Sequence, residues 1–115
     1  MKVRQFEIWI ANLDPRMGTE SGKPRPVLVV QTDLLNKYSH PSTLVCPITS
    51  NVQSEAKVLR VYLDKGISGL HKNCDVMIDQ LRAIDNRRLE RQIGILPDDL
   101  QIQVKNNLLA VLDLL

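Results

Sequence analysis

Most of this chain consists of short segments whose side chains alternate with a period of two, the pattern of a β-strand. In residues 6–12, Phe6, Ile8 and Ile10 occupy every second position, which indicates a strand with one buried face. Clusters of Gly, Pro, Ser and Asn separate the segments and permit antiparallel neighbours, and Pro47 is expected to interrupt one of them. We predict six strands, at residues 6–12, 26–33, 42–51, 57–64, 75–85 and 91–96.

Only the C-terminal stretch, residues 97–115, has a helical period. Pro97 can take the first helical position, and Asp98 and Asp99 follow it at the positive end of the helix dipole. The apolar stripe of an amphipathic helix is formed by Leu100, Val104, Leu108, Val111 and Leu115. Leu109 and Leu112 widen this stripe beyond what one small sheet covers, which favours packing against a second copy of the chain.

The fold class follows from many short strands in a short chain. At 115 residues, the chain can bury one core, so we predict a single domain over residues 1–115. A small closed or half-closed antiparallel barrel leaves the fewest exposed strand edges. We therefore expect a mainly β fold with a C-terminal α-helix.

Composition excludes several classes of protein. The sequence contains no run of about 18 apolar residues, and its N-terminus reaches charged residues too early for a signal peptide, so we expect a cytoplasmic protein without a membrane span. Cys46 and Cys74 match no metal-ligand spacing and are expected to be small buried side chains rather than a disulfide. A net charge of +2 does not by itself indicate a nucleic-acid-binding protein.

Arg25 stands between two prolines, after a loop rich in Gly, Pro and charge. The two prolines should hold Lys23 and Arg25 in extended conformations, so that the guanidinium is presented from a rigid platform. A planar guanidinium binds phosphate oxygens in a bidentate manner, which favours a phosphate site. Spacing alone favours the alternative of an arginine that covers the end of the barrel and pairs with a carboxylate.

Further polar residues lie where strands end. Thr49 and Ser50 follow Pro47, where their hydroxyls could donate to an anion or cap a turn. Glu20, in the loop before Arg25, could accept a proton, pair with Arg25 or be a solvated charge. Asp79 could line a groove or be a buried ion-pair partner.

Three blocks of sequence, read together, resemble a known family. They are G-x-E…R-P-x-L-V at residues 18–29, P-I-T-S at 47–50 and D-Q-x-R-x-I-D at 79–85. In this order they are similar to the MazF/PemK/Kid group of toxin endoribonucleases, over almost the whole chain. The resemblance implies an SH3-like barrel, a homodimer whose interface carries RNA, and metal-independent cleavage of single-stranded RNA. It also implies that Arg25 and Thr49 form the catalytic pair.

The chemistry of such cleavage assigns roles to residues in these blocks. The neighbouring 2′-OH of the RNA is the nucleophile, so the protein needs a proton acceptor, a donor to the leaving oxygen and positive charge at the phosphate. Glu20 is the natural base, Arg25 binds the phosphate, and Thr49 donates to a phosphate oxygen. The residues expected to bind RNA are Lys23, Ser50, Asp79, Gln80 and Arg82. No cofactor or metal is expected, and an acidic antitoxin is the implied partner.

Other residues fall outside this scheme. His40 and His71 lie in polar loops outside the three blocks and are interpreted as surface residues. Some relatives carry an arginine two residues before the aspartate of the third block, where this chain has Met77, so a mechanism that uses that arginine does not transfer. A local basic patch, formed by Arg82, Arg87, Arg88 and Arg91, could bind backbone phosphates or be a solvated face.

Two alternatives remain at the level of sequence. A gyrase-binding toxin of the CcdB type would share the barrel, but its chains end in a Trp-Gly-Ile signature where this one ends in LDLL. A plain SH3-like binding module would line its groove with aromatic residues, and only 3% of this chain is aromatic.

Overall fold

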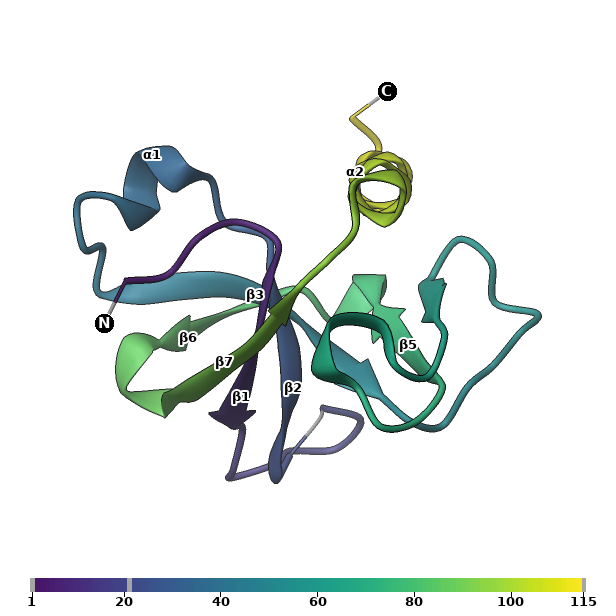
Figure 1. Ribbon diagram of the computed structural model, residues 1–115, viewed down its shortest axis with the longest axis horizontal. Coiled ribbons are helices and arrows are strands. Elements are labelled where there is room, and N and C mark those ends of the chain that lie inside the picture. The colour runs from purple at the N-terminus through teal and green to yellow at the C-terminus, as the bar shows by residue number, and fades with distance from the viewer. Residues whose placement is uncertain (1, 21, 115) are drawn as a thin grey trace.

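The computed structural model describes residues 2–20 and 22–114 and is mainly β, with a C-terminal helix (Figure 1). The strands are β1 (Glu7–Asn12), β2 (Pro24–Val29), β3 (Ser42–Thr49), β4 (Arg60–Leu63), β5 (Cys74–Met77), β6 (Arg82–Asp85) and β7 (Leu89–Ile95). The α-helices are α1 (Asp33–Asn36) and α2 (Asp98–Val111), and the 3-10 turns are η1 (Ile67–Gly69), η2 (Ile78–Gln80) and η3 (Asn86–Arg88). No helix of the described part of the chain is long and apolar enough to cross a membrane.

Strand β3 is the centre of the sheet. The strands run in the order β4-β5-β3-β2-β1-β7, and β6 also pairs with β3. Residues 42–45 of β3 pair with β6, whereas Ile48 and Thr49 pair with β5. Every pairing is antiparallel, as expected. The change of partner bends the sheet into the half-closed barrel that the strand count predicts.

Both faces of the central strands are buried. One core cluster contains Ile8, Leu28 and Cys46, and a second contains Trp9 and Val27. The prediction that the first strand buries only one face is therefore wrong. The sheet curls around the second cluster while α2 and the β4–β5 pair cover the first, so alternate residues all find an apolar environment.

A buried carboxylate accompanies this second cluster. Glu7 is only 8% exposed, and its Oε1 accepts hydrogen bonds from the Arg4 backbone N–H at 2.8 Å and from Trp9 Nε1 at 3.0 Å. Because both donors are satisfied by one oxygen, the indole is buried without an unpaired N–H.

Several predicted strands have different bounds. Those expected at residues 57–64 and 91–96 are β4, at residues 60–63, and β7, at residues 89–95. The strand expected at residues 26–33 is β2, which begins at Pro24 and ends at Val29. It ends early because Thr32 caps α1, where its hydroxyl accepts the Leu34 N–H. The strand expected to break at Pro47 instead continues to Thr49, since Pro47 lies where β3 changes partner from β6 to β5.

The long strand predicted at residues 75–85 is interrupted. β5 ends at Met77, the 3-10 turn η2 follows, and β6 begins at Arg82. Alternation in the sequence continues through this turn because Ile78 is buried in the core while Asp79 is exposed. The interruption allows β5 and β6 to pair with different halves of β3.

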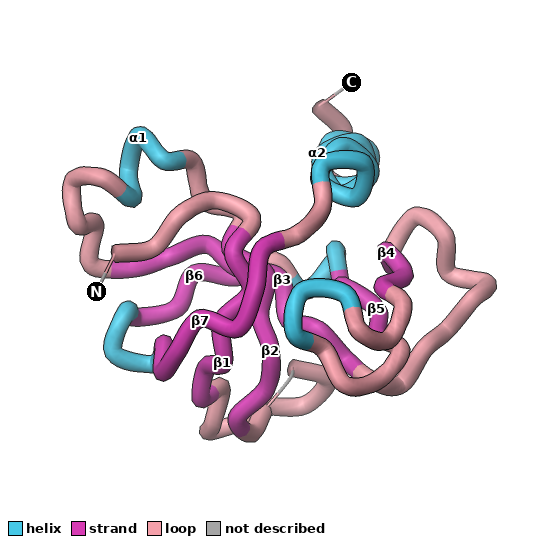
Figure 2. The backbone as a smooth tube through the Cα atoms, in the orientation of Figure 1, coloured by secondary structure: helices cyan, strands magenta, loops and turns pink. Residues whose placement is uncertain are grey.

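Helix α2 lies over the first core cluster, as its stripe predicts. Val104 is fully buried, and Leu100, Leu108 and Val111 pack against the cluster. Figure 2 shows α2 joined to the end of β7 by a short loop. Pro97 is the N-cap rather than the first helical residue. Leu112, at the C-cap, is 49% exposed, and Leu115 of the predicted stripe lies outside the described residues.

The loop that follows β3 is held by a buried ion pair. Asp75 is 1% exposed, and its Oδ2 accepts Arg60 Nη1 at 3.2 Å and the Gln53 backbone N–H at 2.8 Å. The same Arg60 nitrogen donates to the Asn51 carbonyl. Asp75 therefore ties the chain just after Thr49 to β4 and β5.

Replacing Asp75 with asparagine is expected to lower the free energy of unfolding by about 2 kcal/mol, because Arg60 would lose its charged partner in a largely buried place. Urea denaturation measures this change. The matched control is Asp113→Asn, which makes the same substitution at an exposed residue beyond α2 and should change stability little. Equal stability of the two variants would show that the pair does not hold this loop.

Candidate functional site

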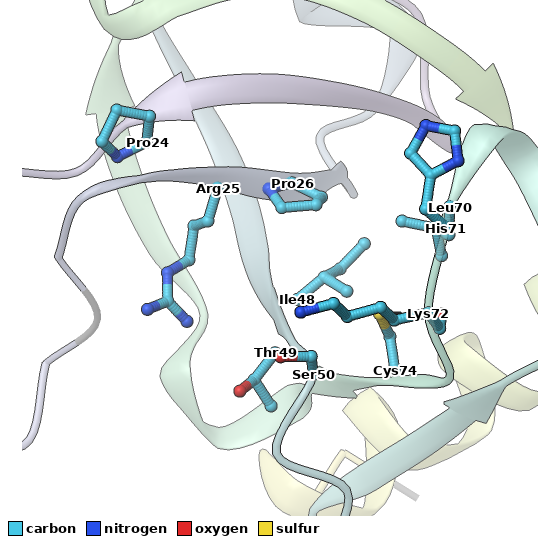
Figure 3. A pocket seen from close by; sticks show the side chains of 10 residues that line it. All are labelled: Pro24, Arg25, Pro26, Ile48, Thr49, Ser50, Leu70, His71, Lys72 and Cys74. Atoms are coloured by element: carbon cyan, nitrogen blue, oxygen red, sulfur yellow. Dashed lines mark hydrogen bonds between the residues drawn. The ribbon is translucent and has the colours of Figure 1, made fainter. Parts of the chain in front are cut away.

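A pocket of about 310 Å³ opens where β2 begins and β3 ends (Figure 3). Its lining residues are Pro24, Arg25, Pro26, Ile48, Thr49, Ser50, Leu70, His71, Lys72 and Cys74. In the β2–β3 ladder Val27 lies opposite Pro47, and continuing that register two residues along places Arg25 opposite Thr49. The pocket is thus a direct consequence of strand pairing, because cross-strand partners project to the same side of a sheet.

Arg25 is fixed at one of its nitrogens and free at the others. Nε donates to the Gly22 carbonyl at 3.0 Å, while the two terminal nitrogens have no hydrogen-bond or ion-pair partner among the described residues. The side chain extends from β2 toward the end of β3, where Thr49 lies (Figure 3). A half-buried guanidinium with unpaired terminal N–H groups is suited to an anionic ligand.

The loop before Arg25 is closely packed against it. Gly22 is buried, and a Cβ at this position would lie 2.6 Å from Arg16 Cβ and 2.8 Å from Asp14 Oδ1. Lys23 has a positive φ of 65°, so the prediction that both prolines hold it extended is wrong. The cause is local, because its N–H donates to Asp14 Oδ1 at 2.7 Å and its carbonyl accepts the Leu13 N–H. Arg25, within β2, is extended as predicted.

The Thr49 hydroxyl is oriented by the turn that follows β3. Its Oγ1 accepts the Asn51 backbone N–H at 3.1 Å. Because the oxygen serves as the acceptor in that bond, the hydroxyl proton is left to donate to a ligand. Ser50 is exposed beside it and also lines the pocket. The predicted turn-capping and anion-donating roles of Thr49 are therefore compatible.

Two residues of this pocket were missed by sequence reasoning. Lys72 and His71 come from the segment between η1 and β5, and Figure 3 shows Lys72 extended into the pocket from the wall opposite Arg25. His71 is exposed, as predicted, but it is not remote from the site. His40 lies by α1, in a different part of the surface. Nothing in the local sequence of residues 71 and 72 indicates this placement.

The other predicted site residues lie outside the walls of this pocket. Glu20 and Lys23 are exposed in the loop between β1 and β2, and Asp79 is exposed on η2. Gln80 Nε2 donates to the Thr19 carbonyl at 3.1 Å, which connects η2 to the loop that carries Glu20. Arg82 is half-buried, and its Nη1 has no hydrogen-bond partner in the described structure.

The predicted basic patch divides into separate groups. Arg87 Nε donates to Asp85 Oδ1 at 3.0 Å, and hydrogen bonds from the Arg87 side chain and backbone lower the pKa of Asp85 to about 2. Arg88 Nη1 donates to the carbonyl of Asn12 at 3.0 Å. Both arginines are thus occupied within the fold, whereas Arg91 lines a second pocket.

The thiols do not supply a nucleophile. Both cysteines are buried and free, as predicted. Burial raises the pKa of Cys46 to about 12 and also raises the pKa of Cys74, so both remain protonated at neutral pH. Within residues 2–20 and 22–114, no group of three His, Cys, Asp or Glu side chains is arranged to hold a metal ion.

Comparison with known proteins shows to which family the chain belongs. A protein-family model described as "PemK-like, MazF-like toxin of type II toxin-antitoxin system" matches residues 4–112. Endoribonuclease EndoA of Bacillus subtilis (strain 168) is 34% identical over 116 residues, which cover 98% of this chain and 99% of EndoA.

Solved structures give the same result. MazF (Form-I) from Deinococcus radiodurans superposes with a TM-score of 0.81 at 25% identity, covering 98% of each chain. Mycobacterium tuberculosis toxin MazF-mt6 superposes with a TM-score of 0.77 at 27% identity, covering 93% of this chain and 96% of its own. A MazE-MazF structure (Form-II) from Deinococcus radiodurans has a TM-score of 0.76 at 26% identity, covering 100% of this chain and 99% of its own. This chain therefore belongs to the family of PemK-like, MazF-like toxins of type II toxin-antitoxin systems.

Proposed function

We propose that this toxin is a metal-independent endoribonuclease that cuts single-stranded RNA in the cytoplasm. The observation that carries the proposal is the pocket that joins the free terminal nitrogens of Arg25 to the Thr49 hydroxyl. Family membership and the endoribonuclease named among its relatives support the choice of substrate. Cleavage of mRNA by such an enzyme would inhibit translation and growth.

In the proposed reaction the 2′-oxygen of the RNA forms a bond to the neighbouring phosphorus, and the bond from phosphorus to the 5′-oxygen breaks. Glu20 accepts the proton of the 2′-OH. Arg25 binds the charged phosphate and donates a hydrogen bond to the departing 5′-oxygen, which takes its proton from solvent, while Thr49 donates a hydrogen bond to a second phosphate oxygen. The products are a 2′,3′-cyclic phosphate and a 5′-OH.

The remaining predicted residues would bind RNA around this centre. Ser50 is placed to donate beside Thr49, and Lys23 lies two residues before Arg25. Asp79 and Gln80 lie on η2 and Arg82 begins β6, so all three follow β5, and they would contact bases or phosphates of the bound strand. Together they would hold the nucleotides next to the cut linkage.

Two protein partners belong to this proposal. A second copy of the chain would cover the exposed apolar residues at the end of α2, namely Leu109, Leu112 and Leu114. A cognate acidic antitoxin would lie over the site, where unpaired cationic groups favour an acidic chain. The MazE-MazF structures of Deinococcus radiodurans, by their names, contain such a toxin with its partner.

Replacing Arg25 with lysine is expected to slow RNA cleavage about 100- to 1000-fold, close to the effect of alanine. Lysine keeps the charge but loses the planar pair of terminal nitrogens that binds two phosphate oxygens. Single-turnover cleavage of a labelled RNA measures the rate. The matched control is Arg87→Lys, because the Arg87 side chain is 91% exposed and lies outside the pocket. RNA binding without cleavage by the unaltered protein would instead indicate a non-catalytic binding module.

Cleavage should continue unchanged in excess EDTA, because the 2′-OH supplies the nucleophile that a metal ion would otherwise generate. The new 5′ ends should be labelled directly by polynucleotide kinase without phosphatase treatment, as 5′-OH ends are. DNA of the same sequence, which lacks the 2′-OH, should remain intact. Loss of activity in EDTA that magnesium restores would overturn the metal-independent mechanism.

The chain is expected to be a homodimer at micromolar concentration, with about twice the 13.1 kDa mass of one copy. Leu112→Glu should shift it toward the monomer, because a charge would enter the proposed apolar interface. Multi-angle light scattering after gel filtration reports the mass. Gln103→Glu, an equal change of charge at another exposed position of α2, is the control. A fully active monomer of the unaltered chain would contradict this expectation.

A further inference from the structure

A second pocket of about 350 Å³ adjoins the first, and the proposed chemistry does not use it. Pro26, Leu70 and His71 line both pockets, so the two lie side by side in one depression and share these residues as the ridge between them. The second continues over β1 and β7, where Ile10 and Arg91 contribute to its walls. Each pocket is of the size that a small ligand fills.

The wall between the two pockets is a segment that is firmly anchored to β7. A Cβ at Gly69 would overlap the carbonyl oxygen of Ile93, and a Cβ at Gly94 would overlap the carbonyl oxygen of Ser68. The Ser68 hydroxyl also donates to the Ile95 carbonyl. Two glycines thus permit η1 to lie directly against β7, with Gly69 in the positive-φ region at 80°.

The same segment is closed on itself beyond η1. The Gly66 N–H donates to the Leu70 carbonyl at 2.9 Å, and Asn73 Oδ1 accepts the Lys65 N–H at 2.8 Å. Leu70 is buried in the first core cluster. The backbone that carries residues 71 and 72 is therefore held at both of its ends, and binding there would cost little loop ordering.

Three polar side chains line this depression without a partner of their own. Lys72 extends into the first pocket, and the ring of His71 is turned away from Arg25 (Figure 3). Arg91 lines the second pocket. None of the three side chains makes a hydrogen bond or ion pair within the described residues, so all remain available to a ligand. Two cations with an imidazole between them match the alternation of phosphates and bases along single-stranded RNA.

We propose that the second pocket is a subsite for the nucleotide next to the cut linkage, an inference that rests on the proposed ribonuclease function. Lys72 contacts the phosphate between the two pockets, His71 stacks on the base, and Arg91 contacts the next phosphate. RNA is favoured over an acidic peptide because the second pocket adjoins the one that contains Arg25 and Thr49, and because the apolar side chains of Ile10 and Pro26 stand beside its polar groups. The flat face of a base can pack against these apolar side chains, whereas a carboxylate gains no binding energy from them.

The test measures binding of a fluorescent RNA oligonucleotide that spans a mapped cut site and carries a single 2′-deoxy nucleotide there, so that it binds but is not cut. Fluorescence anisotropy over a range of salt concentrations gives the affinity and its salt dependence. Lys72→Ala and Arg91→Ala should each reduce the slope of log K against log salt by about 0.7, the value for one phosphate contact on a single strand. Lys65→Ala, the same change at an exposed residue of the same connection, should leave the slope unaltered.

Stacking by His71 has a separate signature. At pH 8, His71→Ala should weaken binding about 5- to 150-fold without changing the salt slope, and His71→Phe should restore most of the affinity. His40→Ala, at an exposed residue near α1, is the matched control and should bind normally. An RNA that lacks the nucleotides expected to occupy the second pocket should no longer show the effect of Arg91→Ala. The effect of Arg25→Lys should remain with the same RNA.

The outcomes separate this proposal from the function on which it rests. If Arg25→Lys abolishes cleavage while the Lys72, His71 and Arg91 variants bind RNA normally, the subsite is wrong and the ribonuclease stands. If the unaltered protein neither binds nor cuts RNA, both are wrong. Weakened binding of an acidic antitoxin peptide, with unchanged RNA binding, would assign the second pocket to the antitoxin and overturn the subsite.

Discussion

The register between β2 and β3 is the constraint on which the site depends. With Val27 opposite Pro47, Arg25 must lie opposite Thr49, and no side-chain interaction is needed to bring the two together. A slip of one residue would turn every side chain of β2 to the other face, so that Val27 and Leu28 would exchange core clusters of different shape and Arg25 would point away from Thr49. The packing of both faces therefore fixes the position of the proposed catalytic pair.

The alternation of side chains along the sequence predicts most of this fold, because it is present wherever a strand buries at least one face. It fails at residues 75–85, where η2 keeps the alternation of buried Ile78 and exposed Asp79 although the strand has ended. It also fails for the first strand, because the sequence pattern does not distinguish a side chain buried in the second core cluster from one buried in the first. Partner exchange along β3 is a property of the assembled sheet and leaves no mark in local sequence.

The site shows the same division between local and distant causes. The placement of Arg25 and Thr49 could be predicted because prolines and hydroxyls at strand ends are local signals, and the family predicted from three spaced blocks is confirmed by the family model. Lys72 and His71 could not, since their place depends on the contact of η1 with β7. Gly69 and Gly94 are the residues that permit this contact, but a glycine in the sequence does not show which part of the backbone approaches it.

The walls of the first pocket contain cations, hydroxyls and apolar groups but no carboxylate. Such a lining stabilises negative charge, and its thiol, that of Cys74, has a raised pKa. The imidazole of His71 also lines the pocket, but its ring is turned away from Arg25 (Figure 3). The proton acceptor of the proposed reaction must then come from the rim. Glu20 lies two residues before Gly22, whose carbonyl holds Arg25 Nε. The loop that orients the phosphate-binding arginine is thus also the loop that carries the proposed base, and one packed turn would coordinate both functions.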